Sequence, residues 1–407
     1  MNSTRPEGAT WPPHQVTTVP WAQTARGGTK EDRTLRSIEV SLPPHIARAA
    51  VPVSPNTLAE MESALRDITV LDRSAGPELT ALGALLIRSE SVASSKIEDE
   101  DEDASIDDYA RALHGHRGNR SASSMVDATA ATEYLILAVA ERKRIDLDLL
   151  TNAHERLMAA DPTERGYAGK VRDMQNWIGG SNYSPRGALY VPPPPSTVAD
   201  YLEDLLDFTN RRDLPVLAQA AIAHAQFESI HPFTDGNGRI GRALMNAILR
   251  CRGATSTVVV PIASGLVGNR DRYFSYLDSY RGGDIEPLLL GMAHAVRMAA
   301  SESLKTAQRL SDLPSIWRDA AGRVRRGSTT DQVLARLEGT SVFTTDELAA
   351  TVSGPTSSVY TAVERLHAVS ILRPLTERTR NQVWGVAAVL DELDDLELRI
   401  RAATREA

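Results

Sequence analysis

One segment of the chain, residues 231–242, carries the residue types needed to bind and process a phosphate. It reads His-Pro-Phe-Thr-Asp-Gly-Asn-Gly-Arg-Ile-Gly-Arg, and glycines on both sides of Asn237 allow a tight turn whose N–H groups can face an anion. Arg239 and Arg242 are three residues apart, so they lie on one face of the helix that follows. Two cations at a helix N-terminus, where acidic residues are preferred, indicate that a polyphosphate fills the site.

The same segment holds a candidate metal ligand and a candidate base. Asp235 provides a hard oxygen beside the predicted phosphates, which suits Mg²⁺ bridging a carboxylate and phosphates. His231 is the nearby side chain that can accept a proton at neutral pH, and Phe233 is expected to anchor the loop in the core. Each residue alone has an ordinary explanation as a cap, a turn or a surface ion pair. Together they predict phosphoryl-type transfer, which depends on positioning and charge stabilisation.

Apolar helices are expected on both sides of this segment, at 216–230 and 240–250, because hydrophobic residues dominate there. Further helical stretches are expected at 42–113, 127–159, 198–208, 272–277 and 287–309. Their expected core residues are Leu79, Leu82, Leu85, Leu86, Ser89, Ala131, Leu135, Leu137, Val139 and Leu149. The predicted fold class is therefore mainly α.

A short β-hairpin interrupts the helical pattern. Gln175–Ile178 and Ala188–Val191 are expected to be two short strands around a turn-rich loop, residues 179–187, and Pro192–Pro195 end the second strand. Because an isolated hairpin is only marginally stable, it is more often a lid or a docking edge than part of a scaffold.

Composition narrows the class of protein. The 407 residues include 45 Lys and Arg against 53 Asp and Glu, a net charge of −8, which argues against a nucleic-acid binder over the whole surface but allows a local basic face. Cys251 is the one cysteine, so an internal disulfide and Cys-based zinc or iron–sulfur sites are excluded. No apolar run approaches the ~20 residues that span a bilayer, and no signal-peptide pattern is present, so a cytoplasmic protein is expected.

Residues 231–242 match the signature of the Fic family, His-x-Phe-x-Asp/Glu-Gly-Asn-Gly-Arg-x-x-Arg, at every fixed position. The hairpin at 175–195 resembles the Fic flap and residues 42–113 resemble the family's N-terminal region, so the resemblance covers about residues 40–300. It implies a Fic-type helical core with a small β-hairpin flap. It also implies Mg²⁺-dependent transfer of AMP from ATP to a hydroxyl side chain of a target protein, with pyrophosphate leaving.

The resemblance implies a role for each residue of the signature. His231 would be the general base, Asp235 would hold Mg²⁺, and Arg242 would meet the γ-phosphate. Asn237 and Arg239 would hold the α- and β-phosphates. The nucleotide-binding set is Phe233, Gly236, Asn237, Gly238, Arg239 and Arg242, with Tyr273 and Tyr276 as candidates to line the base pocket. The target-docking flap residues are Ile178, Gly179, Gly180, Tyr190 and Val191, which would pair with the target as an added strand.

A built-in inhibitor is also implied. The segment Ser94-Ser95-Lys96-Ile97-Glu98, expected after a helix that ends near residue 91, resembles the family's inhibitory motif Ser/Thr-x-x-x-Glu-Gly/Asn, with Asp99 at the Gly/Asn position. In that motif Glu98 would pair with Arg242 at the γ-phosphate position, because a carboxylate can satisfy a guanidinium with two hydrogen bonds. The alternative is that Glu98 only opens the acidic run that follows, whose expected place is a solvated face.

The C-terminal part is expected to be a separate winged helix-turn-helix. Its predicted helices lie at 332–337, 345–350 and 357–368, with wing strands at 371–375 and 382–385 and a capping box of Thr344 with Glu347. The third helix carries Arg365 and His367 but also Glu364, a thin basic face for DNA. The predicted organisation is a flexible or strap-like arm (1–36), an N-terminal helical region with the inhibitory helix (37–120), a catalytic core (121–310), a linker (311–329), the winged helix-turn-helix (330–390) and a helical tail (391–407).

Two functions of different classes stay open at this point. One is a protein adenylyltransferase restrained by Glu98, and the other is a nucleotide-sensing transcriptional regulator that binds DNA through the C-terminal unit. The intact His231 and Asp235 favour the enzyme, because a sensor needs no base. The sequence does not settle the transferred group (UMP and phosphocholine are alternatives), the target protein, self-modification or whether the protein is a homodimer.

Overall fold

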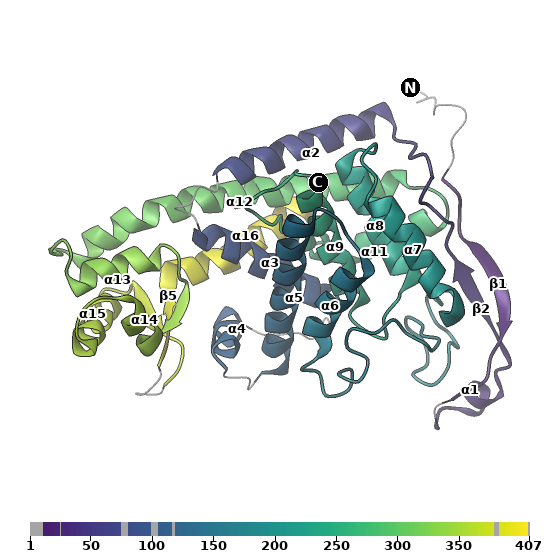
Figure 1. The fold of residues 1–407 in the computed structure, drawn as a ribbon, viewed down its shortest axis with the longest axis horizontal. Helices are drawn as coiled ribbons and strands as arrows, with labels where there is room; N and C mark the ends of the chain where they lie inside the picture. The colour runs from purple at the N-terminus through teal and green to yellow at the C-terminus, as the bar shows by residue number, and fades with distance from the viewer. Residues whose placement is uncertain are drawn as a thin grey trace. The chain divides into compact units, whose positions relative to one another are not determined.

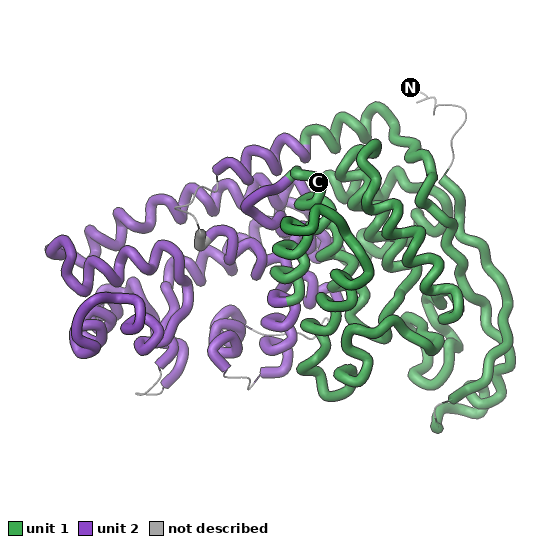
Figure 2. The backbone as a smooth tube through the Cα atoms, viewed as in Figure 1, with its two compact units in different colours: residues 1–63, 131–254, 270–293 green, residues 64–130, 255–269, 294–407 purple. Residues whose placement is uncertain are grey.

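The computed structural model describes residues 11–24, 26–74, 80–98, 105–115, 119–377 and 382–405. The chain divides into two compact units, the first of residues 1–63, 131–254 and 270–293 and the second of residues 64–130, 255–269 and 294–407 (Figure 2). Both are mainly helical, as the sequence predicts (Figure 1). Among the described residues no helix is long and apolar enough to cross a membrane.

The first unit holds residues 231–242 and the elements around them. Its elements are β1 (Gln15–Pro20), α1 (Lys30–Thr34), β2 (Ser37–Leu42), the first part of α2 (Pro55–Ser74), the second part of α5 (Arg120–Arg142), α6 (Leu147–Met158), the 3₁₀ turn η2 (Pro195–Thr197), α7 (Val198–Thr209), α8 (Val216–Ile230), α9 (Asn237–Cys251), α11 (Arg270–Arg281) and the start of α12 (Glu286–Ala321). The helix α8 packs against α7, α9 and α11. Every residue of α8 after Val216 is buried, so it is the central helix of the unit.

The N-terminal arm contains more regular structure than its composition suggests. The strand β1 pairs with β2 in antiparallel register from Gln15↔Leu42 to Pro20↔Ser37. The helix α1 begins with a capping box in which Thr29 accepts from the Asp32 N–H. Tertiary packing explains the difference, because Trp11 of the arm is buried (2% exposed), as is Val40 of the paired strand β2 (1% exposed), although residues 1–36 have no apolar period. Residues 1–10 of the expected arm lie outside the described part of the chain.

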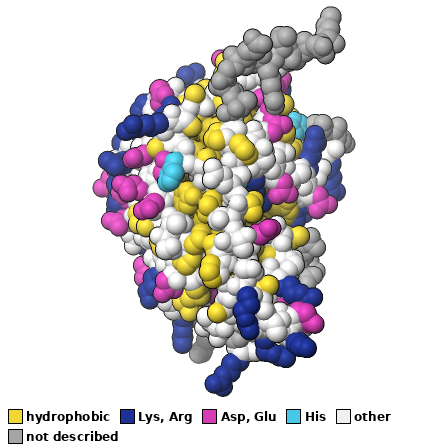
Figure 3. All heavy atoms as spheres, turned by 90° about the vertical axis from the view of Figure 1, so that its right-hand side faces the viewer, with side chains coloured by type: hydrophobic (Ala, Val, Ile, Leu, Met, Phe, Trp, Pro, Cys, Tyr) yellow, Lys and Arg dark blue, Asp and Glu magenta, His cyan; other side chains and the backbone are white. Residues whose placement is uncertain are grey.

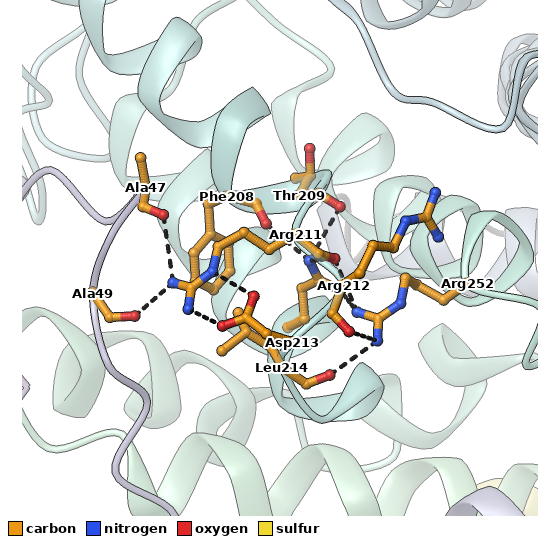
Figure 4. A network of polar contacts seen from close by, with 10 residues as sticks. Ala47, Ala49, Phe208, Thr209, Arg211, Arg212, Asp213, Leu214 and Arg252 are labelled. Atoms are coloured by element: carbon orange, nitrogen blue, oxygen red, sulfur yellow. Dashed lines mark hydrogen bonds and ion pairs between the residues drawn. The ribbon is translucent and has the colours of Figure 1, made fainter.

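The turn between α7 and α8 is fixed by arginine side chains (Figure 4). Arg252 donates to the carbonyl oxygens of Arg211 (3.1 Å), Arg212 (3.2 Å) and Leu214 (3.0 Å). Arg211 donates to the Ala47 and Ala49 carbonyls and to the Asp213 carboxylate. Burial and the neighbouring Arg212 lower the pKa of Arg252. These guanidiniums therefore satisfy backbone carbonyls at a helix junction, which is a structural task.

The second unit combines helices with a small sheet. Its elements are the end of α2, α3 (Thr80–Glu98), α4 (Ile106–Leu113), the start of α5, α10 (Ile262–Val267), the rest of α12, α13 (Thr329–Leu337), β3 (Val342–Thr344), α14 (Thr345–Thr351), α15 (Thr356–Ala368), β4 (Leu372–Pro374), β5 (Val383–Val386) and α16 (Ala387–Arg405). α3, α10 and α16 pack against one another. The strands form an antiparallel sheet in the order β3-β5-β4.

The C-terminal elements follow the predicted order of helix, helix, helix and two strands. The capping box of Thr344 with Glu347 is present at the start of α14. The strand β3 was not expected, because three residues carry too little pattern to be recognised. Residues 378–380, between the two predicted wing strands, lie outside the described residues.

Two other expectations are wrong. The first half of the predicted linker is helical, since α12 continues through Pro314 to Ala321. The buried side chains of Leu310 and Trp317 (6% and 4% exposed) continue the apolar stripe past the proline, so packing outweighs the lost backbone hydrogen bond. Leu137, expected in the core, is 64% exposed, because a residue two positions from the buried Leu135 points to the opposite side of a helix.

The other expected core residues in the described chain are buried: Leu82, Leu85, Leu86, Ser89, Ala131, Leu135, Val139 and Leu149. Leu79 lies outside the described residues. The hydrophobic stripe of α3 is therefore where the sequence places it.

Candidate active site

His231 lies at the C-terminal end of α8, in a backbone conformation that is unusual for a residue with a side chain. Its φ is 50°, in the left-handed region, and its N–H donates to the Phe227 carbonyl at 2.9 Å, which closes the last turn of α8. Its Nδ1 lies 3.9 Å from the Glu228 carboxylate. Left-handed backbone at a non-glycine residue is maintained only where the surroundings determine it, as is common at active sites.

The loop after His231 is closed by the side chain of Asn237. Its Oδ1 accepts from the Phe233 N–H at 2.8 Å, and its Nδ2 donates to the Phe233 carbonyl at 2.9 Å. Asn237 is also the first residue of α9, which begins three residues earlier than the sequence suggested. The amide side chain therefore has a task within the loop, and contact of Asn237 with the phosphates stays a prediction.

His154 of α6 supports the same loop and was missed by sequence reasoning. The Gly169 N–H donates to its Nδ1 at 3.0 Å, so Nε2 carries the hydrogen and donates to the Asp235 carbonyl at 3.0 Å. Its ring stacks on Phe233 with centroids 3.8 Å apart and a 4° angle between planes. Burial lowers the pKa of His154 to about 4 despite the nearby Asp235, so the ring is neutral at pH 7. Phe233 is 1% exposed, as expected of an anchor.

Gly236, the N-cap of α9, has φ +73°, and a Cβ there would lie 2.8 Å from Leu157 Cδ2 and 3.2 Å from Met158 Sδ. We expect Gly236→Ala to lose about 1–3 kcal/mol more stability than Gly253→Ala. Backbone strain is common to both variants, and overpacking against Leu157 and Met158 is added at Gly236. Gly253 is a matched control, since it has the same φ of +73° and a Cβ added there would meet no described atom within 4 Å. Denaturant unfolding of both variants measures the difference, and equal losses would contradict a packed Gly236.

The start of α9 presents the predicted metal ligand and the first arginine. The Asp235 side chain is 55% exposed; its Oδ1 accepts from the Gly236 N–H at 2.6 Å and its Oδ2 lies 3.7 Å from Arg239 Nη2. Within the described residues no group of three or more His, Cys, Asp or Glu could hold a metal ion. One accessible carboxylate fits Mg²⁺, which keeps several waters and takes other oxygens from phosphates.

Arg242 lies one turn further along α9 and is 1% exposed. Its Nη1 donates to the Tyr273 hydroxyl at 3.4 Å, and the same hydroxyl is 2.9 Å from His224 Nε2. Tyr273 is itself 1% exposed, so its position suits support of Arg242. A direct contact of Tyr273 with a nucleotide stays a prediction. Tyr276 packs against Gly291, where a Cβ would overlap its ring.

The hairpin is present, but its pairing is limited to one antiparallel bridge, Ile178↔Tyr190. Side-chain hydrogen bonds also tie the two segments to α8 and to the loop that follows it. Asn176 donates to the Phe233 carbonyl at 2.8 Å, and the Tyr190 hydroxyl donates to the Ser229 carbonyl at 2.7 Å. Tyr190 is buried, with Arg281 3.8 Å above its ring, whereas Gly179 and Gly180 are exposed.

The strand β2 and the N-terminal arm contact the hairpin. The Ser41 N–H donates to the Val191 carbonyl at 2.9 Å, so that part of the hairpin edge is already paired. Ser184 donates to Asp32 at 2.6 Å, and the arm and the hairpin loop line a cleft of about 660 Å³. Figure 3 shows the side on which Figure 1 draws β1 and β2, where an interrupted band of hydrophobic side chains runs between charged ones. Leu189 of the hairpin is 86% exposed, which leaves an apolar contact for a partner.

Ser94 and Glu98 lie in the second unit, within the last turns of α3. The helix runs through Glu98 and does not end near residue 91, so the two side chains share one face four residues apart. Ser94 is buried and Glu98 is exposed, while Asp99 lies outside the described residues. Because Glu98 and Arg242 belong to different units, their pairing stays a prediction.

Comparison with known proteins agrees with the signature. Residues 144–249 match the model of the Fic/DOC family. The chain contains a Fic/DOC domain. The domain includes α6, α7, α8 and most of α9, and so the loop of His231 and the stacked His154. The resemblance inferred from residues 231–242 is confirmed.

Curated relatives of the Fic/DOC domain carry enzyme names. The chain is 31% identical over 196 residues to protein adenylyltransferase fic-1 of Caenorhabditis briggsae, over 47% of this chain and 34% of that protein. It is 36% identical over 104 residues to a probable protein adenylyltransferase of Aquifex aeolicus, over 24% of this chain and 29% of that protein. The chain thus spans about a third of the length of these relatives.

A solved structure extends the likeness beyond the Fic/DOC domain. A Fic family protein from Desulfovibrio desulfuricans G20 superposes with a TM-score of 0.50 and 22% identity, over 83% of this chain and 97% of that one. At this identity the likeness concerns the fold alone. The mainly helical fold with a small hairpin agrees with the fold class expected from the sequence.

Proposed function

We propose that this protein transfers AMP from ATP to a hydroxyl side chain of a target protein, with pyrophosphate as the leaving group. The observation that carries the proposal is the loop between α8 and α9. It holds His231 in a fixed left-handed conformation beside a helix start that offers backbone N–H groups, Arg239 and a carboxylate. Adenylyltransferase relatives that share the Fic/DOC domain support the same reaction.

In this proposal the residues act by position and charge. His231 takes the proton of the target hydroxyl, so that the oxygen can attack the α-phosphorus of ATP in line with the leaving pyrophosphate. The N–H groups at the start of α9 and the guanidinium of Arg239 stabilise charge on the α- and β-phosphates, and Arg242 meets the γ-phosphate. The hairpin presents the target segment, with exposed Leu189 as an apolar contact.

Mg²⁺ bound at Asp235 would neutralise phosphate charge when ATP binds. We expect Asp235→Ala to weaken ATP binding in the presence of Mg²⁺ about tenfold or more, because the accessible carboxylate at the start of α9 is lost. Calorimetric titration with ATP, with Mg²⁺ and with EDTA, measures the effect. Asp213→Ala is a control on an exposed carboxylate outside the site. If Asp235→Ala and its parent show the same gain in affinity from Mg²⁺, Asp235 is not the metal ligand.

We further propose that Glu98 inhibits the enzyme by pairing with Arg242 at the γ-phosphate position. The support is the four-residue spacing of Ser94 and Glu98 on one face of α3 and the resemblance to the family's inhibitory motif, from which Asp99 departs at the Gly/Asn position. A carboxylate there would compete with the γ-phosphate for the guanidinium. The inhibited state would then bind ATP weakly or with its α-phosphate misaligned.

Mass spectrometry of the Glu98→Gly protein after incubation with ATP and Mg²⁺ is the experiment that tests the function. A mass gain of one adenylyl group on this chain, or on a protein of a cell lysate, is the expected result. Parallel incubations with UTP and CDP-choline test the alternative groups. If none of the three donors labels any protein, a transferase function is wrong.

A transcriptional regulator is the second candidate, because the C-terminal elements have the order of a winged helix-turn-helix. We propose that assignment for residues 330–386. On α15 the exposed residues include Thr356, Ser357, Tyr360 and Arg365. The Arg365 guanidinium is already used, since it donates to the Ala321 and Arg323 carbonyls, which weakens the case for DNA. A mobility-shift assay with genomic fragments, with and without ATP, decides this point.

A further inference from the structure

Arg172 is a buried cation between the hairpin and the loop of His231. It lies in the segment between α6 and the hairpin and is 3% exposed. Within the described part of the chain no carboxylate forms an ion pair with it. Burial lowers the pKa of Arg172 to about 10, so the guanidinium is still charged at neutral pH. A buried charge of this kind is costly unless it is fully hydrogen-bonded, so its partners are informative.

The hydrogen-bond partners of Arg172 among the described residues are backbone carbonyl oxygens, and they come from two places. At the end of α8 and the start of the loop, Nε donates to the His231 carbonyl at 2.8 Å and Nη2 donates to the Ile230 carbonyl at 3.3 Å. The Arg172 backbone N–H also donates to Pro232 at 2.9 Å. Three successive carbonyls around the candidate base are thus held by one residue.

The other partners of Arg172 lie at the two ends of the hairpin. Nη1 donates to the Met174 carbonyl, just before the first segment, at 3.0 Å, and Nη2 donates to the Pro193 carbonyl, just after the second, at 2.7 Å. Because a guanidinium is planar and rigid, these bonds fix the two ends of the hairpin relative to His231.

We propose that Arg172 is a positioning residue that sets the distance between the target hydroxyl on the hairpin and the base His231. This inference rests on the proposed transfer function. Other groups, at the start of α9 and on its first turns, would hold the nucleotide. None of the hydrogen bonds of Arg172 described above reaches these groups. Loss of Arg172 should therefore affect the approach of the target and leave nucleotide binding intact.

The test compares Arg172→Lys with Arg252→Lys in the Glu98→Gly background. Arg252 is a matched control, because it also binds three backbone carbonyls of the first unit, at the junction of α7 and α8 (Figure 4). A lysine keeps the charge but cannot reach several carbonyls at once. We expect Arg172→Lys to lower the rate of transfer to protein about 100-fold, as a misplaced reacting group does. Its ATP affinity should stay within about threefold of the parent, and Arg252→Lys should transfer at the parental rate.

Chemical rescue separates positioning from general damage to the fold. Millimolar guanidinium ion added to Arg172→Ala should restore part of the transfer rate, whereas it should not change the parent. Parental transfer by Arg172→Lys would overturn the proposal. So would equal losses of transfer, ATP affinity and melting temperature in Arg172→Lys and Arg252→Lys, because a merely structural arginine predicts that pattern.

Hydrogen exchange does not depend on activity, so it distinguishes failure of this inference from failure of the proposed function. The amides of Leu189 and Tyr190 donate to the Ile178 carbonyl, and the His231 amide donates to Phe227. Hydrogen exchange at these amides should accelerate in Arg172→Lys and not in Arg252→Lys. If the parent transfers no group, the proposed function fails, and unchanged exchange at these three amides would also reject Arg172 as the link between hairpin and loop.

Discussion

Replacement of His231 by Ala is expected to lower transfer by about 10²–10⁴-fold, the usual contribution of a general base, while ATP binding persists. Transfer and ATP binding are expected to respond differently, because different groups of the site carry them. The phosphates would be held by the start of α9, by Arg239 and by Arg242, and the positive charge of these groups does not depend on the imidazole. Only deprotonation of the target hydroxyl requires His231.

Auto-modification rates and ATP affinity of His231→Ala, both in the Glu98→Gly background, measure the two effects. His45→Ala is a suitable control, since His45 lies in the same unit with a 62% exposed side chain. If His231→Ala retains substantial transfer, the histidine is not the base. If it loses ATP binding as well, its main task is to shape the loop.

The position of the loop could be predicted from sequence because its signals are local. Two apolar helices flank a polar segment, and glycines on both sides of Asn237 mark a turn. The sequence predicts that α9 starts at residue 240, because Gly-Asn-Gly by itself indicates a turn. In the structure α9 starts at Asn237, whose side chain bonds to the Phe233 backbone. Of the two glycines, only Gly236 takes the left-handed conformation that the turn requires.

The residues that hold the loop could not be predicted, because their partners have no side-chain signature. The Arg172 guanidinium bonds to carbonyls up to 59 residues away, and His154 bonds to the Asp235 carbonyl 81 residues away. A carbonyl looks the same at every position of a sequence, so no complementary residue type marks the pairing. From the sequence, Arg172 could not be told from the neighbouring Lys170, which is exposed.

The hairpin illustrates the same limit. Alternation and turn residues located both segments, but they predicted two strands where the structure has one bridge. Backbone hydrogen bonds between the two segments are confined to Ile178, Leu189 and Tyr190, and other polar groups of the hairpin bond to Phe233, Ser229 and Ser41. Short strand pairing is therefore supplemented by contacts with α8, the loop after it and β2, which no local pattern reports.

Replacement of Glu98 by Gly is expected to raise transfer tenfold or more. If Glu98 pairs with Arg242, the variant frees a guanidinium and the space of the γ-phosphate, so ATP can bind with its α-phosphate presented in line to the target hydroxyl. A hydrogen bond to a charged group is worth roughly 1.5–3 kcal/mol, so loss of the competing carboxylate from Arg242 corresponds to a gain in rate of this size.

The structure of α3 adds a control to this experiment. Glu98 is the last residue of the helix, and the turn before it is anchored by buried Ile97 and by Lys96, whose Nζ lies 3.0 Å from Glu397 of α16. A glycine at the end of a helix therefore should not unravel α3. Glu98→Gln tests this directly, because it removes the charge and keeps the side chain. Similar activation by both variants assigns the effect to the carboxylate, and activation by glycine alone assigns it to the backbone.

Arg242→Ala, added to Glu98→Gly, should cancel most of the gain, because the γ-phosphate then lacks its partner. The affinity for ADP, which has no γ-phosphate, should change little in Glu98→Gly, while the affinity for ATP rises. Transfer rates, ATP affinities and ADP affinities are measured for wild type, both single variants and the double variant, which together form a double-mutant cycle. Equal transfer by wild type and Glu98→Gly would mean that the carboxylate does not compete with the γ-phosphate. Glu98 would then be only the first residue of an acidic, solvated run.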